Sequence, residues 1–202
     1  MAIFNQVNQD TIIWDKMRSG DENAYRQIYE GHFDMLYRYG RKMAWDEGQC
    51  EDCIQDLFIK LWQNRDNLGT TDSIKNYLFT SLRRLIIRKQ KDRSKATDPV
   101  EMKNHDDAEP TFEEFLIQDE VDAEKKQKLQ KALSQISARQ REVIYLRFYQ
   151  NMEYEEICEV MDISYQGARN MLFKAVKSMK DKLSFIFLSL MGYKYLNAVF
   201  DG

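Results

Sequence analysis

The chain has 202 residues, of which 43% are hydrophobic and 31% are charged, and its formal net charge is −3. This composition excludes a disordered protein, because it supplies enough apolar side chains for one large domain or two small ones. The acidic total also excludes binding to polyanions through overall charge, so any contact with nucleic acid requires a locally basic surface. The low numbers of proline (2) and glycine (8) favour an all-α fold.

Four amphipathic helices are predicted within residues 10–96. Asp10 is a candidate N-cap for a short first helix that ends at Ser19 and Gly20, and Asp21 is a candidate N-cap for a longer second helix. The side chains predicted to point inward from the second helix are Tyr25, Ile28, Tyr29, Phe33, Leu36 and Tyr37.

The third predicted helix contains the sequence CEDCIQDLFIKLW and includes a CxxC pair. Two thiolates are too few for a tetrahedral zinc site, and Cys158 and both histidines lie in other segments. We predict that all three cysteines are small buried hydrophobic residues and that the protein holds no metal or other cofactor. The apolar stripe of this helix comprises Cys50, Cys53, Ile54, Leu57, Phe58, Leu61 and Trp62.

The fourth predicted helix begins at a Ser73 cap and ends in a basic cluster. The bases of this cluster are opposed in the local sequence only by Asp92. Such a block favours a surface that faces phosphates, although compensation of the helix dipole explains part of it. The cluster comprises Arg83, Arg84, Arg88, Lys89, Lys91, Arg93 and Lys95.

An acidic linker is predicted at residues 97–124, where apolar periodicity is lost and both prolines, Pro99 and Pro110, occur. After it, "SARQ" at Ser137–Gln140 is a candidate capping box that opens a helix with Val143, Ile144, Leu146 and Phe148.

Beyond residue 183, the tail 184–202 is apolar, but Gly192 and Lys194 interrupt it. We therefore expect a docking helix there and, without a secretory signal, a cytoplasmic protein.

The stretch EYEEICEVMDISYQGARNMLFKAVKSMK predicts two amphipathic helices with a short turn between them. Ser164 is a candidate N-cap of the second helix, whose apolar stripe contains Ala168, Leu172, Ala175, Val176 and Met179. The polar and basic side chains outside that stripe suit a helix-turn-helix in which the second helix enters a DNA groove. A helical hairpin with a solvated basic face would show the same pattern.

The ordered set of motifs resembles the extracytoplasmic-function (ECF) group of bacterial sigma factors, in the sigma-70 family. SGDENAYRQIYEGHFDMLYRYGRKM is similar to the start of that family, and CEDCIQDLFIKLWQNRDNL to its polymerase-binding segment. SIKNYLFTSLRRLIIRKQKDR resembles the segment that melts and reads the −10 element. The stretch from ALSQISARQ to KSMKDKL resembles the fourth sigma domain, which reads the −35 element.

The resemblance implies two helical modules joined by the linker: a domain 2-like bundle at residues 10–96 and a domain 4-like helix-turn-helix at 125–183. It implies a non-enzyme that binds core RNA polymerase and promoter DNA, has no small-molecule substrate and is regulated by a membrane-linked anti-sigma factor. At the first position of the turn the family often has glycine where this chain has Asp162, which tolerates left-handed geometry. Arg83 and Arg84 also depart from the family pattern, so base preference at the −10 element stays open.

The resemblance further implies three sets of binding residues. The −35 element would be contacted by Ser164, Tyr165, Gln166, Arg169, Asn170, Phe173, Lys174 and Lys177. The −10 element would be contacted by Asn76, Tyr77, Arg83, Arg84, Arg88, Lys89 and Lys91. Core polymerase would be contacted by Asp52, Gln55, Asp56, Phe58, Lys60 and Trp62.

Alternatives remain for the polymerase face and for the whole protein. Leu57, Phe58 and Trp62 are equally consistent with plain core packing. Asp52 and Asp56 form an acidic pair with no base at i+4 from Asp52, so we interpret them as an unpaired face that either is solvated or meets a basic partner. The whole chain could instead be a dimeric helix-turn-helix regulator that does not associate with polymerase, or an adaptor that binds only protein, but both leave the Arg83–Lys95 cluster without a role.

Overall fold

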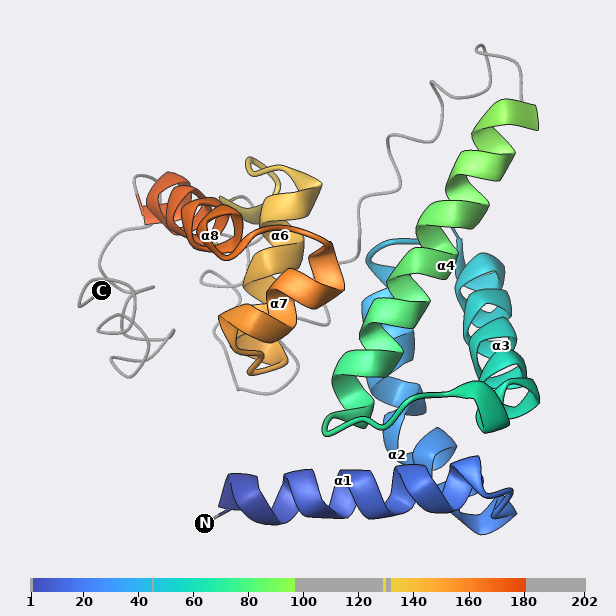
Figure 1. The fold of residues 1–202 in the computed structure, drawn as a ribbon. Coiled ribbons are helices and arrows are strands. Elements are labelled where there is room, and N and C mark those ends of the chain that lie inside the picture. The colour runs from blue at the N-terminus through green and yellow to red at the C-terminus, as the bar shows by residue number, and fades with distance from the viewer. Residues whose placement is uncertain (1, 45, 97–128, 130–131, 181–202) are drawn as a thin grey trace. The chain divides into compact units, whose positions relative to one another are not determined.

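The structure is a computed structural model that describes residues 2–44, 46–96, 129 and 132–180 (Figure 1). The described residues form helices and no β-strand, which confirms the predicted all-α class. The chain divides into two compact units, Met1–Thr111 (unit 1) and Phe112–Gly202 (unit 2). The predicted linker and apolar tail lie outside the described residues, so the predicted segment bounds stay predictions. None of the described helices has the length and apolar character needed to span a bilayer.

Unit 1 is a bundle in which α2, α3 and α4 contact one another and α1 runs across one end of them (Figure 1). The inward side chains of the four helices are almost fully buried, among them Trp14, Ile28, Leu36, Ile54, Phe79 and Leu82. The elements of unit 1 are α1 (Ala2–Arg18), α2 (Glu22–Arg41), α3 (Glu47–Gln63), the short 3₁₀ turn η1 (Arg65–Asn67) and α4 (Ile74–Ala96).

The predicted caps of unit 1 are partly confirmed. Asp21 caps α2 by accepting hydrogen bonds from the amides of Asn23 and Ala24. Asp10 does not begin the first helix, because α1 already starts at Ala2. Its Oδ2 instead accepts from the amide of Ile74 at 3.0 Å, so Asp10 caps the distant helix α4.

Helix α4 therefore has two side-chain acceptors at its N-terminus. Ser73 Oγ accepts from the amide of Asn76 at 3.2 Å, which confirms Ser73 as a cap. Each acceptor satisfies one of the amides that an α-helix leaves without an internal partner in its first turn. The start of the basic helix is thus tied both to its own loop and to α1.

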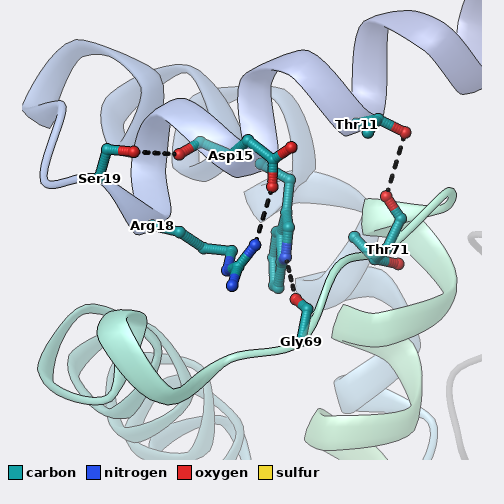
Figure 2. Close-up of polar contacts among 7 residues, drawn as sticks. Thr11, Asp15, Arg18, Ser19, Gly69 and Thr71 are labelled. Carbon is teal, nitrogen blue, oxygen red and sulfur yellow. Dashed lines mark hydrogen bonds and ion pairs between the residues drawn. The ribbon is translucent and has the colours of Figure 1, made fainter.

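The loop between η1 and α4 is held by the side chains of α1 (Figure 2). Trp14 Nε1 donates to the carbonyl of Gly69 at 2.8 Å, and Thr11 Oγ1 donates to the carbonyl of Thr71 at 3.3 Å. The Trp14 ring also meets the ring of Tyr77 edge-on, with centroids 4.8 Å apart. Helix α1 therefore fixes the entry into α4 by polar and aromatic contacts together.

Two sequence predictions about buried side chains need correction. In α2, Tyr29 is 37% exposed, whereas Tyr39, which was not predicted as inward, is 1% exposed. Cys50 and Cys53 are fully buried, as predicted, and burial raises the pKa of both thiols, that of Cys50 to about 12. Cys158 is only partly buried, so the prediction of a buried thiol is wrong there.

Unit 2 contains the predicted capping box and the two helices of the helix-turn-helix. Ser137 Oγ accepts from the amide of Gln140, and the Gln140 side chain accepts from the amide of Ser137, as the SARQ motif predicts. Helix α6 packs on α8, and so does α7. The elements of unit 2 are α6 (Ala138–Ile144), the π-helical segment η4 (Tyr145–Tyr149), α7 (Tyr154–Met161) and α8 (Tyr165–Lys180).

A buried arginine organises the turn from η4 into α7 and was not predicted. Arg147 is 8% exposed, and its Nη1 donates to the carbonyl of Met152 at 2.7 Å and to Glu153 Oε2 at 2.8 Å. The carbonyl and the carboxylate together compensate for the burial of the charge. Arg147 lies in the π-helical segment η4, whose residues Tyr145 and Leu146 are also buried.

Candidate nucleic-acid and polymerase interfaces

The turn between α7 and α8 has the geometry that a helix-turn-helix requires. Asp162 adopts the left-handed conformation, with φ 53° and ψ 57°, and the next amide, of Ile163, donates to the carbonyl of Cys158 at 3.2 Å. Ser164 Oγ accepts from the amide of Gly167 at 3.1 Å, which confirms Ser164 as the N-cap of α8. The short turn thus ends one helix and starts the next, and the Ser164 cap satisfies one of the first-turn amides of α8.

Helix α8 separates its apolar and polar side chains cleanly. Ala168, Leu172, Ala175 and Met179 are buried, and Val176 is partly buried. Of the predicted −35 contacts, Arg169 is partly exposed, and the exposed ones are Ser164, Tyr165, Gln166, Asn170, Phe173, Lys174 and Lys177. All eight therefore lie on the accessible side of α8 and its cap, where they form a candidate DNA-binding face.

The first turn of α8 is supported from the preceding helix. The rings of Tyr154 and Tyr165 lie 5.4 Å apart, and the Arg147 guanidinium lies 5.2 Å from the centre of the Tyr154 ring. Burial raises the pKa of Tyr154, and the nearby charges of Arg147 and Arg169 act in the opposite direction. Within the face, Gln166 Nε2 donates to Asn170 Oδ1 at 3.0 Å, so these two amides are already oriented relative to each other.

The predicted −10 residues of α4 fall into two groups. Arg84, Arg88 and Lys91 are exposed, and Lys89 is partly exposed, so these four form a basic surface. Asn76 and Arg83 are 9% and 8% exposed, and Tyr77 is packed against Trp14. The structure therefore brings the later bases of α4 to the surface and places Asn76 and Arg83 within the packing of unit 1.

The predicted polymerase residues of α3 also divide between surface and core. Asp52, Gln55 and Lys60 are exposed, and Asp56 and Trp62 are partly exposed. Phe58 is 2% exposed and Leu57 is 4% exposed, so for both side chains the core alternative describes the structure. The centres of the Trp62 and Tyr25 rings lie 5.0 Å apart, and the Arg65 guanidinium lies over the Trp62 ring, 4.6 Å from its centre.

The interpretation of Asp56 as part of an unpaired acidic face is wrong. Lys89 Nζ of α4 lies 2.8 Å from Asp56 Oδ2, across the contact between α3 and α4. The basic cluster is likewise not opposed by Asp92 alone, because Arg93 lies 3.8 Å from Asp46, the N-cap of α3. Spacing along one helix indicates only pairs within that helix, whereas these pairs join residues far apart in the chain.

Comparison with known families identifies the chain. Residues 28–96 match the model of sigma-70 region 2, and residues 126–179 match the model of sigma-70 region 4. The two matches together span more than half of the chain and occur in the order expected for the family. The chain belongs to the sigma-70 family.

Curated relatives place this sigma factor in the ECF group. It is 28% identical over 164 residues to the ECF RNA polymerase sigma factor SigL of Mycobacterium tuberculosis, a match that covers 77% of this chain and 86% of that protein. It is 24% identical to the ECF RNA polymerase sigma factor SigX of Bacillus subtilis, covering 84% and 89% of the two chains.

Two solved structures share the fold of this sigma factor. The sigma factor RpoE of Bartonella quintana, in complex with the anti-sigma factor NepR, is 20% identical with a TM-score of 0.58, covering 80% of this chain and 97% of that one. CnrH in complex with the cytosolic domain of CnrY is 19% identical with a TM-score of 0.56, covering 85% and 95%.

Family membership decides between the functions that the sequence left open. A sigma factor is a transcription initiation factor and not an enzyme, and its partners are core RNA polymerase and promoter DNA. A dimeric helix-turn-helix regulator independent of polymerase would account for the region 4 match but not for the region 2 match. The basic surface of α4 belongs to the matched region 2, so it is part of the sigma architecture.

Proposed function

We propose that this sigma factor reads the −35 element with the exposed face of α8. The observation that carries this proposal is the arrangement of α8, where a Ser164-capped N-terminus is followed by Gln166, Arg169 and Asn170 and then by Lys174 and Lys177. Polar side chains in the first turns suit base edges, and lysines farther along suit phosphates.

We propose that α4 carries the −10 contacts on its basic surface. Arg84, Arg88 and Lys91 are accessible for phosphates, and their neighbour Lys89 is partly so. The buried residues Asn76 and Arg83 would have to become accessible when unit 1 binds DNA, and until then they support the helix from within. Tyr77 is poised at the same end of α4 by its contact with Trp14.

We propose that core polymerase binds the exposed side of α3 through Asp52, Gln55, Asp56, Lys60 and Trp62. The exposed carboxylates suit a basic surface on the polymerase, where truncating one partner of a desolvated charge pair costs about 2–5 kcal/mol. Because Phe58 is buried, its contribution to this surface would be to position α3 and not to touch the partner.

The experiment that tests the polymerase contact compares two charge-matched double variants of the full chain. Asp52→Ala with Asp56→Ala should abolish co-elution with core polymerase in gel filtration and transcription from a cognate promoter. Glu30→Ala with Asp34→Ala removes the same charge from exposed positions one turn apart on α2, and it should retain both activities. Normal transcription by the first variant would place the polymerase contact elsewhere.

The two modules, 10–96 and 125–183, are proposed to act on separate promoter elements across the 97–124 linker. Limited proteolysis should cut between residues 98 and 120 and release two folded helical fragments, because the acid-rich linker has little to bury. Full resistance to cleavage in this segment would contradict an independent linker.

We propose that the protein acts in the cytoplasm, since its polymerase partner is there, and that a membrane-linked anti-sigma factor restrains it. The similar structures of RpoE and CnrH, solved as complexes with NepR and with the cytosolic domain of CnrY, support this proposal. Affinity capture from detergent-solubilised cells should recover the chain together with a membrane protein that blocks polymerase binding, and fractionation should recover the chain that is free of this partner in the soluble fraction. Capture of the chain with polymerase alone under all growth conditions would contradict such a partner.

A further inference from the structure

The contact between Asp56 and Lys89 joins two surfaces with different proposed partners. Asp56 lies on the α3 face assigned to polymerase, and Lys89 lies on the α4 surface assigned to DNA. Their side chains are 42% and 35% exposed, and Lys89 Nζ is 2.8 Å from Asp56 Oδ2. Each group is therefore accessible to an external partner and at the same time occupied by the other.

The strength of this ion pair is suited to exchange. Pairs with this degree of exposure contribute only about 0–1 kcal/mol, because water screens the charges and two side chains must be held in one geometry. Burial lowers the pKa of Lys89, but the hydrogen bond and charge of Asp56 outweigh it, so the pKa is raised overall and the ammonium keeps its charge. Loss of the pair costs the fold little, while both charges remain available.

We propose that the Asp56–Lys89 ion pair couples polymerase binding to DNA binding. A basic group of the polymerase that binds Asp56 displaces Lys89, and the released ammonium then contacts a DNA phosphate. In the free protein, Asp56 competes with phosphate for Lys89 and weakens DNA binding. This inference rests on the proposed polymerase and −10 surfaces.

Thermodynamic linkage fixes the size and symmetry of the effect. A phosphate bound to Lys89 must strengthen polymerase binding by the same factor by which polymerase strengthens the phosphate contact. The factor cannot exceed the strength of the pair that is exchanged, which corresponds to about two- to fivefold in affinity.

The first test measures binding of the free full-length chain to a fluorescent DNA duplex at several salt concentrations. Asp56→Asn should tighten binding about two- to fivefold and steepen the log–log salt dependence by about 0.9, the value for one added phosphate contact. Asp34→Asn removes the same charge from an exposed position on α2 and should leave the slope unchanged. In a Lys89→Gln background, Asp56→Asn should have no effect beyond that of Asp34→Asn.

Equal effects of Asp56→Asn and Asp34→Asn, or an Asp56→Asn effect that persists in the Lys89→Gln background, would overturn the proposal. The first outcome would mean that only net charge matters, and the second would mean that Asp56 affects DNA binding without acting through Lys89. Circular dichroism of each variant checks that the DNA affinities being compared are those of folded proteins.

The second test measures affinity for core polymerase without DNA. Lys89→Gln should bind polymerase about two- to fivefold more tightly than wild type, because Asp56 no longer has an internal partner, whereas Arg26→Gln on α2 should not. Unchanged affinity of Lys89→Gln, with wild type binding polymerase normally, would overturn the coupling alone. Failure of the wild type to bind polymerase would overturn the proposed function and the coupling with it.

Discussion

Gly40 of α2 and Cys50 of α3 approach so closely that a Cβ added to Gly40 would lie 2.6 Å from Cys50 Sγ. Both residues are buried, and the same Cβ would also approach Leu82 and Ile86 of α4. The close contact of α2 and α3 therefore depends on a residue without a side chain. It also explains why a small thiol, and not a larger apolar side chain, occupies position 50.

Gly40→Ala should lower the unfolding free energy of unit 1 by about 1–3 kcal/mol through overpacking. The higher helix propensity of alanine should offset up to about 1 kcal/mol of this loss. The Cys50 side chain is fully buried, so it has little space in which to move away from the new methyl group. In a Cys50→Ala background the same change should cost at least about 1 kcal/mol less. Denaturant unfolding of the four proteins measures this coupling, and additive effects of the two changes would contradict the contact.

Asp10→Ala should destabilise unit 1 by about 0.5–2 kcal/mol, because the amide of Ile74 loses its side-chain acceptor. Asp10→Asn keeps an acceptor and loses only the interaction of a charge with the helix dipole, about 0.3–1 kcal/mol. Thermal and denaturant unfolding would rank the three proteins. If Asp10→Ala were neutral, the link from α1 to the start of α4 would not contribute to stability.

Asp162 tests the left-handed turn of the helix-turn-helix. Asp162→Ala should destabilise unit 2 by about 1–2 kcal/mol relative to Asp162→Gly, because alanine has a Cβ that clashes in this conformation and no side-chain polar group to compensate. Hydrogen exchange of the α7 and α8 amides reports the local effect. Equal stability of the alanine and glycine variants would show that the turn adopts another conformation.

Arg147→Met should destabilise unit 2 by about 1–3 kcal/mol, since the buried carbonyl of Met152 loses its charged donor. Glu153→Gln is the matched control, because the Glu153 side chain is 68% exposed and its ion pair should contribute less than about 1 kcal/mol. Denaturant unfolding compares them. Equal losses in the two variants would assign the stabilisation to the ion pair and not to the carbonyl contact.

Lys174→Ala and Lys177→Ala should each weaken binding to all DNA sequences and flatten the log–log salt dependence by about 0.9. Arg169→Ala should also relax sequence choice, at about 1–3 kcal/mol, if its guanidinium reaches a base edge. Lys16→Ala, at an exposed position of α1, serves as the control for lost charge. Unchanged promoter selectivity in Arg169→Ala would remove that residue from the recognition set.

The elements whose causes are local could be predicted from the sequence. Apolar spacing placed the helices, and the caps at Asp21, Ser73, Ser137 and Ser164 could be read directly, since each side chain bonds an amide two or three residues later. The exposed face of α8 could be predicted for the same reason, because the side chains opposite an apolar stripe face away from the core.

Which residues meet across helices depends on how the helices pack in three dimensions. Asp10 caps a helix more than sixty residues away, Asp56 pairs with Lys89, and the buried Arg147 donates to the carbonyl of Met152. Each of these depends on the packing and path of the backbone and not on local spacing. Periodicity specifies which side of a helix is apolar, but whether a charge at its edge meets water, a partner or a neighbouring helix is decided when the helices pack.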